Sequence, residues 1–309
     1  MNKPLVVVVL GPTASGKTSL GIEIAERFSG EIVSADSMQI YENMDIATAK
    51  PSAEELARVK HHLIGFVPMG ADFSVAKYKE KAIAAIDDIL SRGKLPVVVG
   101  GTGFYVDTLI KNTEFFDYEN TDIREKLEAR CEQEGIEVLF DELKNIDPKT
   151  ADRLHINDTK RILRALEVYH LTGQTISRQA EMSHLTESKY RWCLIGLRAQ
   201  DRQYLYDRIN RRVDIMLEEG LLKEAESFFD SEISKTAAQA IGYKELKPYI
   251  DGFVSVGEST EKLKMGTRRY AKRQLTWFRR NAGINWLDID LYTADELIDK
   301  ACSIVENER

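Results

Sequence analysis

The stretch Gly11-Pro12-Thr13-Ala14-Ser15-Gly16-Lys17-Thr18, directly after the apolar run Leu5–Leu10, decides the fold. It matches the P-loop pattern, in which a glycine-rich turn joins a buried strand to a helix. Apolar side chains at every fourth position from Leu20 to Phe28 predict the required helix. Glycines let backbone N–H groups turn inward around phosphate oxygens, and the helix N-terminus adds its positive end. We therefore expect a bound di- or triphosphate, with Lys17 at the outer phosphates and Thr18 at a magnesium ion.

Four further apolar runs, rich in β-branched residues, are typical of buried parallel strands. They are Glu31–Ala35, Leu95–Val99, Arg191–Leu197 and Ile284–Ile289. Helical patterns separate most of these runs, and such alternation predicts an α/β fold of the P-loop NTPase type, built on a doubly wound parallel sheet. A last helix is expected over Ala294–Val305.

Residues 112–189 interrupt this alternation, because they show helical periodicity and no convincing strand. Their first helix has one apolar face from Ile123 to Cys131, and Gly135 breaks the pattern. We therefore predict a P-loop catalytic core formed by residues 1–111 and 190–309, which carries an all-helical insertion of residues 112–189.

Two more helices are expected within the insertion. One opens at Asp147-Pro148, and the next is capped by Asn157 and ends at Gly173. Lys160, Arg161 and Arg164 occupy about one quarter of the circumference of this last helix, and apolar side chains face the other way. Such a stripe is either a solvated face or a surface for an anionic partner.

Composition sets the background for these motifs. A chain of 309 residues, with 43% hydrophobic and 30% charged residues, reads as a soluble protein of about two domains. Cys131, Cys193 and Cys302 are odd in number and far apart, which favours a reducing cytoplasm over a disulfide framework or a zinc site. The opening run is a strand and not a signal peptide, and no stretch is long enough to span a bilayer. The net charge of −7 counts against nucleic acid, but local basic stripes matter more than the sum.

A polar cluster follows the second predicted strand, in the segment Ala35–Tyr41. The carboxyl ends of parallel strands face the ligand crevice, so Asp36 is placed to touch magnesium or to take a proton from a nucleophile. The alternative is an aspartate that caps its own turn. Ser37 and Gln39 add donors and acceptors, and a glutamine can read an adenine edge with both amide groups.

The third strand runs into a second glycine-rich segment, Gly100–Tyr105. Three glycines around Thr102 let the backbone approach a ligand closely. No acid ends this strand, so the Walker B position of a standard ATPase is missing there.

Two basic groups lie in the C-terminal half. Arg208 and Arg212 are four residues apart in a segment that we expect to begin a helix, where paired guanidinium groups can clamp a pyrophosphate. A later helix is expected to gather six cations within roughly 140° of its surface. They are Arg268, Arg269, Lys272, Arg273, Arg279 and Arg280. With no lipid anchor or leucine-rich face, RNA or phosphate is the favoured partner over a membrane.

The pair His61-His62 resembles a metal motif, but adjacent residues of a strand point to opposite faces. We interpret both histidines as packing or hydrogen-bonding residues.

The combined motifs resemble the bacterial tRNA dimethylallyltransferases, also called isopentenyl-diphosphate:tRNA transferases. The resemblance runs in order over nearly the whole chain. Its segments are Gly11–Thr18, Asp36–Tyr41, Met44–Pro51, His61–Ile64, Gly100–Tyr105, Arg153–Asp158, Arg161–Glu167, Gln239–Lys244 and Thr267–Arg279.

The resemblance implies that the P-loop cradles the pyrophosphate of dimethylallyl diphosphate and not ATP. The acceptor would be the exocyclic N6 amine of the adenosine just 3′ of the anticodon, in tRNAs that read codons starting with U. Asp36 would then take the proton of the amine, while Lys17, Mg²⁺ on Thr18, and Arg208 or Arg212 would meet the charge of the leaving pyrophosphate. The loop residues expected at the diphosphate are Gly11, Thr13, Ala14, Ser15, Gly16, Lys17 and Thr18.

The same resemblance implies a tRNA surface on both domains, with the insertion clamping the anticodon stem-loop. Its expected residues are Asp36, Ser37, Met38, Gln39, Thr102, Arg124, Lys160, Arg161, Arg164, Gln239, Gly242 and Lys244. Ala47 and Ile156 depart from the usual glycine and proline of the family, at positions expected to lie away from the chemistry.

Three alternatives stay open on sequence grounds. A small-molecule or nucleotide kinase would share the P-loop and the sheet and would turn over ATP. An adenylate isopentenyltransferase would use a free nucleotide, and a non-catalytic RNA-binding protein would not need Asp36. We expect a cytoplasmic monomer with no membrane and no obligate protein partner.

Overall fold

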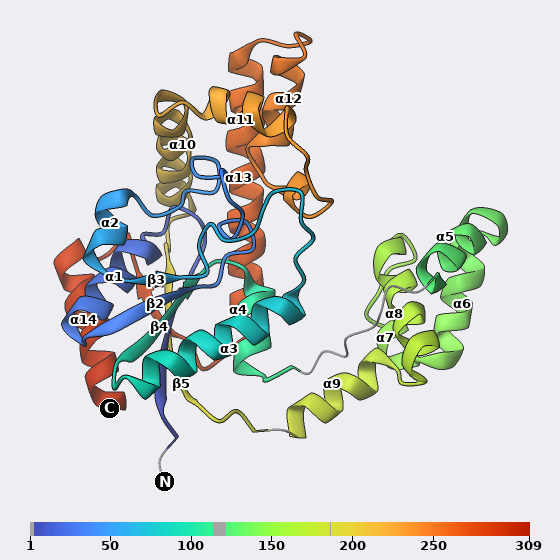
Figure 1. Ribbon diagram of the computed structural model, residues 1–309, viewed down its shortest axis with the longest axis horizontal. Coiled ribbons are helices and arrows are strands. Elements are labelled where there is room, and N and C mark those ends of the chain that lie inside the picture. The colour runs from blue at the N-terminus through green and yellow to red at the C-terminus, as the bar shows by residue number, and fades with distance from the viewer. Residues whose placement is uncertain (1–2, 114–121, 186) are drawn as a thin grey trace. The chain divides into compact units, whose positions relative to one another are not determined.

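The computed structural model describes residues 3–113, 122–185 and 187–309 (Figure 1). The chain divides into two compact units, one of residues 1–109 and 189–309 and one of residues 110–188. The sequence predicts an insertion of residues 112–189.

The first unit is built on one parallel sheet of six strands in the order β3-β2-β4-β1-β5-β6. The strands are β1 Leu5–Leu10, β2 Gly30–Ser34, β3 His61–His62, β4 Leu95–Gly100, β5 Arg191–Arg198 and β6 Asn285–Asp288. All five predicted strands are present, and the two-residue strand β3 adds an edge beside β2. The predicted α/β fold with a parallel sheet is therefore confirmed.

Helices accompany the sheet and extend beyond it. They are α1 Lys17–Arg27, α2 Ala53–Arg58, α3 Val75–Ser91, α4 Gly103–Ile110, α10 Arg202–Glu218, α11 Leu221–Phe229, α12 Tyr243–Ile250, α13 Val256–Phe278 and α14 Ala294–Glu308. The expected start of a helix at Arg208 is wrong, because α10 already begins at Arg202, where the Asp201 carboxylate accepts a hydrogen bond from the N–H of Gln203.

The core of the first unit surrounds β1, which lies between β4 and β5. Val6 to Leu10 are at most 1% exposed, as apolar side chains must be in a central strand with both faces covered. Helices α1 and α14 pack on each other and on the sheet, and Ile22, Cys302 and Val305 join its inner residues in one cluster. This rigid core fixes the carboxyl ends of β1, β2 and β4.

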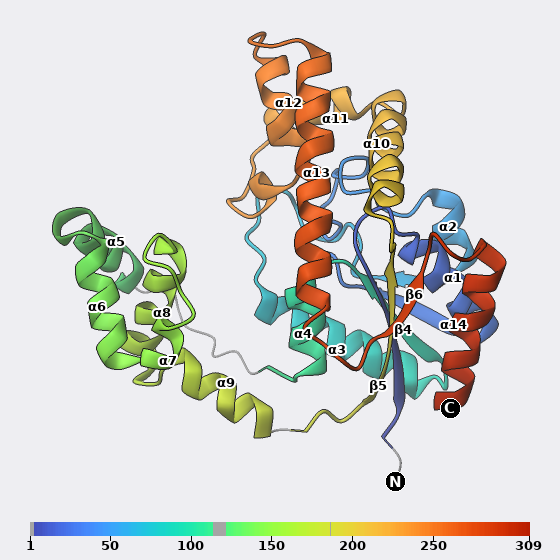
Figure 2. The ribbon, with the colours of Figure 1, turned by 180° about the vertical axis from the view of Figure 1, so that it is seen from behind.

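Helices α10 to α13 contact one another in sequence and project together from the sheet (Figures 1 and 2). We call residues 202–278 the helical arm. Its longest helix, α13, runs from the tip of the arm back to the sheet, so one helix serves both parts of the unit.

The second unit consists of helices and turns throughout residues 122–185. They are α5 Ile123–Glu134, α6 Ile136–Ile146, α7 Pro148–Ala151, α8 Thr159–Thr172 and α9 Ile176–Leu185. Leu127, Leu139, Leu143, Ile162 and Leu166 form its separate core. As predicted, α5 ends at Gly135 and α8 at Gly173. The predicted cap of α8 is one residue early, because the capping position is Asp158.

Candidate active site

The P-loop turns between β1 and α1 with the geometry of an anion cradle. Gly16 has a φ of 91° at the cap of α1, a left-handed conformation that a side chain disfavours. Ala14 also has a positive φ, of 61°. A Cβ atom on Gly11 would lie 2.8 Å from the carbonyl oxygen of Leu197, so β5 leaves room only for glycine. The turn thus leads directly into the N-terminus of α1, the positive end of that helix.

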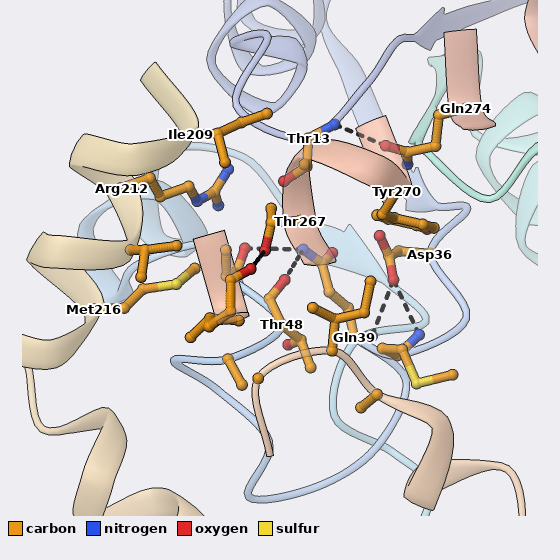
Figure 3. A pocket seen from close by; sticks show the side chains of 18 of the residues that line it. Thr13, Asp36, Gln39, Thr48, Ile209, Arg212, Met216, Thr267, Tyr270 and Gln274 are labelled. Atoms are coloured by element: carbon orange, nitrogen blue, oxygen red, sulfur yellow. Dashed lines mark hydrogen bonds between the residues drawn. The ribbon is translucent and has the colours of Figure 1, made fainter. Parts of the chain in front are cut away.

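A pocket of about 340 Å³ opens between the carboxyl ends of the strands and the helical arm (Figure 3). Lys17 and Thr18 line it from the P-loop, and Asp36 to Gln39 line it from the segment after β2. A second cavity of about 380 Å³ adjoins it and shares Lys17, Thr18, Ala49 and Arg212. The site therefore has two connected compartments that meet at the P-loop lysine.

The second compartment is strongly cationic. Its lining includes five cations, with Glu55 as an acidic neighbour. They are Lys17, Lys50, Arg208, Arg211 and Arg212. Arg208 donates from Nε to the carbonyl oxygen of Ala14 at 2.8 Å, which fixes its guanidinium at the P-loop. The structure thus places both arginines selected from the sequence in one compartment with residues of the P-loop.

Burial is the main cause of two pKa shifts in this compartment. Burial, with Arg212 adding to it, lowers the pKa of Lys17 to about 8, although Asp36 acts in the opposite direction. Burial also lowers the pKa of Arg212. Buried cations are unfavourable because they have lost their hydration and repel one another. A multiply charged anion that binds between them compensates both costs, so this compartment is suited to such a ligand.

Asp36 lies two residues after the end of β2 and lines the first compartment. Its Oδ1 accepts hydrogen bonds from the N–H of Met38 at 2.9 Å and, more weakly, from that of Gln39 at 3.4 Å (Figure 3). One carboxylate oxygen of Asp36 thus caps its own turn, as the alternative interpretation of the sequence predicts. Burial and then the charge of Asp36 raise the pKa of Tyr270, a pocket residue from α13. Asp36 therefore acts on groups across the pocket as well as on its own turn.

Thr102 and Ser37 form hydrogen bonds with each other at the edge of the pocket. The N–H of Ser37 donates to Thr102 Oγ1 at 3.0 Å, and Thr102 Oγ1 donates to Ser37 Oγ at 3.2 Å. Met38, Gln239, Gly242 and Lys244 also line the pocket, so the structure gathers these expected RNA-contacting residues around Asp36.

Gln39 does not have the free amide that reading a base requires. Its Nε2 donates to the carbonyl oxygens of Thr48 at 3.2 Å and Ala49 at 2.9 Å, and its Oε1 accepts from Ser34 Oγ at 3.3 Å. The side chain therefore ties the loop after Met44 to β2, which corrects the expected direct role at an adenine edge.

The glycines after β4 also have a different use from the one expected. A Cβ atom on Gly101 would lie 2.3 Å from Gln274 Nε2, and one on Gly103 would lie 2.3 Å from Trp277 Cδ1. They admit α13 and not a ligand. The 5% exposed side chain of Gln274 then accepts from the N–H of Thr13 at 2.9 Å and donates to the carbonyl oxygen of Gly101 at 2.8 Å. Gln274, which the sequence did not single out, thus joins the P-loop to the end of β4.

Ala47 lies in the pocket wall, contrary to the expectation that this position is remote from the chemistry. It faces Gly242, whose φ is 121° and on which a Cβ atom would lie 2.9 Å from Ala47 Cβ. The N–H of Ala47 donates to the carboxylate of Glu224, a residue of α11 that sequence reasoning missed.

The basic residues of the second unit are only partly free. Arg124 bonds Glu128 Oε1 at 2.6 Å and approaches Glu167 to 3.8 Å, while Arg164 bonds the same Glu167 at 2.9 Å. Lys160 and Arg161 are exposed on α8. Arg161 approaches the carboxylate of Asp158 to 3.8 Å, so all three of these arginines have an acidic neighbour.

The six cations that the sequence predicts on one helical face do not share one environment in the structure. Arg268 donates to Asn210 Oδ1 at 2.6 Å and thus turns toward α10, whereas Arg273 lines the pocket. Arg279 and Arg280 lie past the last helical residue, Phe278, so they do not extend the predicted helical face.

The two histidines of β3 make separate hydrogen bonds. His61 Nδ1 lies 2.7 Å from the carbonyl oxygen of Val59, and His62 Nε2 lies 2.8 Å from Glu31 Oε2. Among the described residues no three His, Cys, Asp or Glu side chains form a metal-binding group. The hydrogen-bonding interpretation of both histidines is confirmed.

Among the described residues, no helix is both long and apolar enough to cross a membrane.

Residues 39–281 match the protein family described as IPP transferase. A tRNA dimethylallyltransferase of Acetivibrio thermocellus is 51% identical over 96% of this chain and 95% of its own length. Another, from Halalkalibacterium halodurans, is 47% identical over 93% and 92%.

Solved structures agree with these relatives. The tRNA isopentenylpyrophosphate transferase of Bacillus halodurans has a TM-score of 0.72 at 43% identity, covering 99% of this chain and 96% of the other. A eukaryotic dimethylallyltransferase acting on tRNA has a TM-score of 0.82 at 28% identity, covering 98% and 80%.

Proposed function

The chain belongs to the IPP transferase family, and on that premise we infer that it is a tRNA dimethylallyltransferase, a prenyltransferase that modifies tRNA. In finer terms, we propose transfer of a dimethylallyl group from dimethylallyl diphosphate to N6 of the adenosine 3′ of the anticodon, in tRNAs reading U-starting codons. The observation that carries this proposal is one pocket in which a P-loop, an apolar wall and Asp36 meet.

The diphosphate half of the donor fits the cationic compartment. Backbone N–H groups of the P-loop, Lys17 and the two arginines Arg208 and Arg212 would hold its oxygens. As the carbon–oxygen bond breaks, the electron pair leaves with the diphosphate, and the same cations would stabilise the added negative charge. They would act most strongly here because the compartment is partly desolvated.

The allylic half fits the apolar lining of the first compartment. Ile209, Val213, Met216, Leu221 and Leu263 line it from α10, the start of α11 and α13. A five-carbon chain buried there is removed from water, at a gain of roughly 0.8 kcal/mol per CH₂. A kinase pocket has no need for such a wall beside its transferred phosphate, so the lining favours the prenyl donor over ATP.

Asp36 is placed for the acceptor. An exocyclic amine of an adenine that has left its stack would donate a hydrogen bond to the carboxylate, and its nitrogen would attack the allylic carbon in line with the leaving oxygen. The new bond joins N6 to that carbon, and Asp36 would take the proton released from nitrogen. Ser37 and Thr102 are bonded neighbours that would help to position the base.

A magnesium ion also fits the donors present. Thr18 and Asp36 both line the pocket with oxygen atoms, the hard ligands that Mg²⁺ prefers. One or two protein oxygens together with substrate phosphates are a usual set for this ion, and Thr18 would be its principal protein ligand. When bound, Mg²⁺ supplies charge neutralisation at the leaving diphosphate.

The second unit would hold the anticodon stem-loop through its exposed basic residues, Lys160 and Arg161 among them. We propose a cytoplasmic monomer, because the substrate is tRNA and the pocket is complete within one chain.

A transfer assay tests the function. Purified protein, Mg²⁺, dimethylallyl diphosphate and an unmodified anticodon stem-loop with adenosine 3′ of the anticodon are mixed, and RNA mass is followed. We expect the addition of one C5H8 unit, dependent on the stem-loop and independent of ATP. Transfer to free adenylate in its place would indicate an adenylate isopentenyltransferase. No gain in RNA mass, with ATP consumed when small acceptors are supplied, would indicate a kinase.

A further inference from the structure

Glu224 of α11 binds a turn of the backbone that lies far from it in sequence. Its Oε2 accepts hydrogen bonds from the N–H groups of Asp45 at 2.9 Å and Ile46 at 2.7 Å. Its Oε1 accepts from the N–H of Ala47 at 2.9 Å and from the hydroxyl of Tyr243 at 2.8 Å. Both oxygens thus accept two bonds each, and three successive backbone donors converge on one carboxylate in the manner of an anion-binding nest.

The turn held in this way is part of the reaction pocket. Ala47, Thr48 and Ala49 line the first compartment, and Ala49 continues into the cationic one. Gln39 fixes the other side of the turn through the carbonyl oxygens of Thr48 and Ala49. We call residues 45–49 the wall loop. Its turn is closed by hydrogen bonds from the N–H of Ala49 to the carbonyl oxygen of Ile46 and from the N–H of Lys50 to that of Asp45, and Glu224 and Gln39 join this turn to the rest of the pocket.

The wall loop also meets the helical arm directly. Gly242 lies against Ala47 so closely that a Cβ atom would come within 2.9 Å of Ala47 Cβ. Tyr243 follows Gly242, stacks on Phe228 with ring centroids 3.9 Å apart, and donates its hydroxyl to Glu224. The contact between loop and arm is therefore close-packed, and the apolar lining of the pocket belongs to the same arm.

From these contacts we propose that Glu224 is a positioning residue which holds the wall loop against the helical arm and so limits the length of the allylic donor. This inference rests on the proposed prenyl transfer. The allylic chain would lie between the apolar side chains of the arm and Ala47 to Ala49. A loop released from Glu224 would widen that space, misplace a five-carbon donor and admit a longer one.

A glutamate is required at this position because all four partners are donors. Glutamine has the same shape, but its amide NH₂ group would confront donors with a donor. Glu224→Gln therefore keeps the packing of the helix and loosens the loop. Tyr243→Phe removes one of the four bonds and keeps the aromatic stacking, so it should give a smaller effect of the same kind.

The test compares dimethylallyl diphosphate with geranyl diphosphate as donors to the stem-loop. For Glu224→Gln we expect kcat/KM with the five-carbon donor to fall by about 10–100-fold, the range for misplacement of a reacting group by about 1 Å. The ratio of geranyl to dimethylallyl transfer should rise by at least about tenfold, since the longer donor loses less. Glu226→Ala, at an exposed residue of the same helix, should leave the ratio unchanged.

Amide hydrogen exchange at residues 45–47 provides a second readout that needs no turnover. We expect faster exchange in Glu224→Gln and wild-type exchange in Glu226→Ala. A general loss of stability would lower the rates with both donors equally, so an unchanged donor ratio would overturn the proposal, as would unchanged exchange in the loop. If the wild-type protein transfers neither donor, the proposed function fails, whereas exchange and calorimetric binding of the two diphosphates still decide the role of Glu224.

Discussion

Replacement of Asp36 by asparagine separates the chemistry of the pocket from its architecture. Oδ1 of Asp36 accepts from the N–H groups of Met38 and Gln39, and the carbonyl oxygen of an asparagine can accept the same two bonds. The turn after β2 is therefore expected to persist. What is lost is the negative charge and, with it, the proposed proton transfer from the adenine amine to the second oxygen.

The size of the loss follows from two effects of the carboxylate. A positioned general base contributes about 10²–10⁴-fold, so kcat at saturating substrates should fall by that factor, or by about 2.7–5.4 kcal/mol. Asp36 also raises the pKa of Lys17, which lies at about 8 in its presence. Without Asp36 that pKa falls further, more of the lysine is neutral near neutral pH, and KM for the allylic diphosphate rises.

The assay resolves these two effects by pH. Transfer rates are measured from pH 6 to pH 8.5 with both substrates varied, and stem-loop affinity is measured separately. Lower pH protonates Lys17 again and should restore KM for the diphosphate, but it should not restore kcat.

Asp290 offers a control outside the pocket, where its Oδ1 accepts from the N–H of Gln200 and its Oδ2 from that of Asp201. Asp290→Asn should have wild-type kinetics. A wild-type kcat in Asp36→Asn would refute the general-base argument, and so would losses of turnover and RNA affinity by the same factor.

Three further predictions follow from the remaining contacts. In the wild-type protein, KM for the diphosphate should rise above about pH 8, where Lys17 of the ligand-free protein loses its proton. Because the bound anion favours the protonated lysine, calorimetry near that pH should detect proton uptake on binding. Gln274→Ala leaves the N–H of Thr13 and the carbonyl oxygen of Gly101 without their partner, so thermal unfolding should show a loss of about 1–3 kcal/mol, and an unchanged melting temperature would contradict the bridge. Stem-loop affinity should fall steeply with salt, and Lys160→Ala should reduce the logarithmic slope by roughly 1. Lys144→Ala, at a lysine ion-paired with Asp141, should leave that slope as it is.

Local patterns were sufficient to predict the fold. The apolar runs mark their strands because a parallel sheet covered on both faces requires continuous burial, and Val6 to Leu10 show it fully. Strand β3 is not among the five predicted strands of the sheet, because two residues carry no periodic signal, although His61 and His62 are interpreted from the sequence as strand residues. The predicted start of α10 was too late, because the helix is capped by Asp201, seven residues before Arg208.

The site was predicted less completely, because its architecture depends on contacts between distant residues. Gln274 and Thr13 are 261 positions apart, and Glu224 and Ala47 are 177 apart. No spacing rule connects such pairs. For the same reason Gln39 and Gly101 were assigned to a ligand, whereas the folded chain itself uses the amide of one and the missing side chain of the other.

The divided first unit has a consequence for synthesis on the ribosome. Strand β1 pairs with β4 on one side and with β5 on the other, and all of residues 110–188 are made between β4 and β5. At roughly 5–20 residues per second, β1 waits on the order of ten seconds with one valine-rich edge unpaired. During that interval the helical unit, whose contacts are local, is free to fold first. The nascent chain is therefore most vulnerable to edge-to-edge aggregation just before residue 191 emerges, which is when a chaperone would be most useful to it.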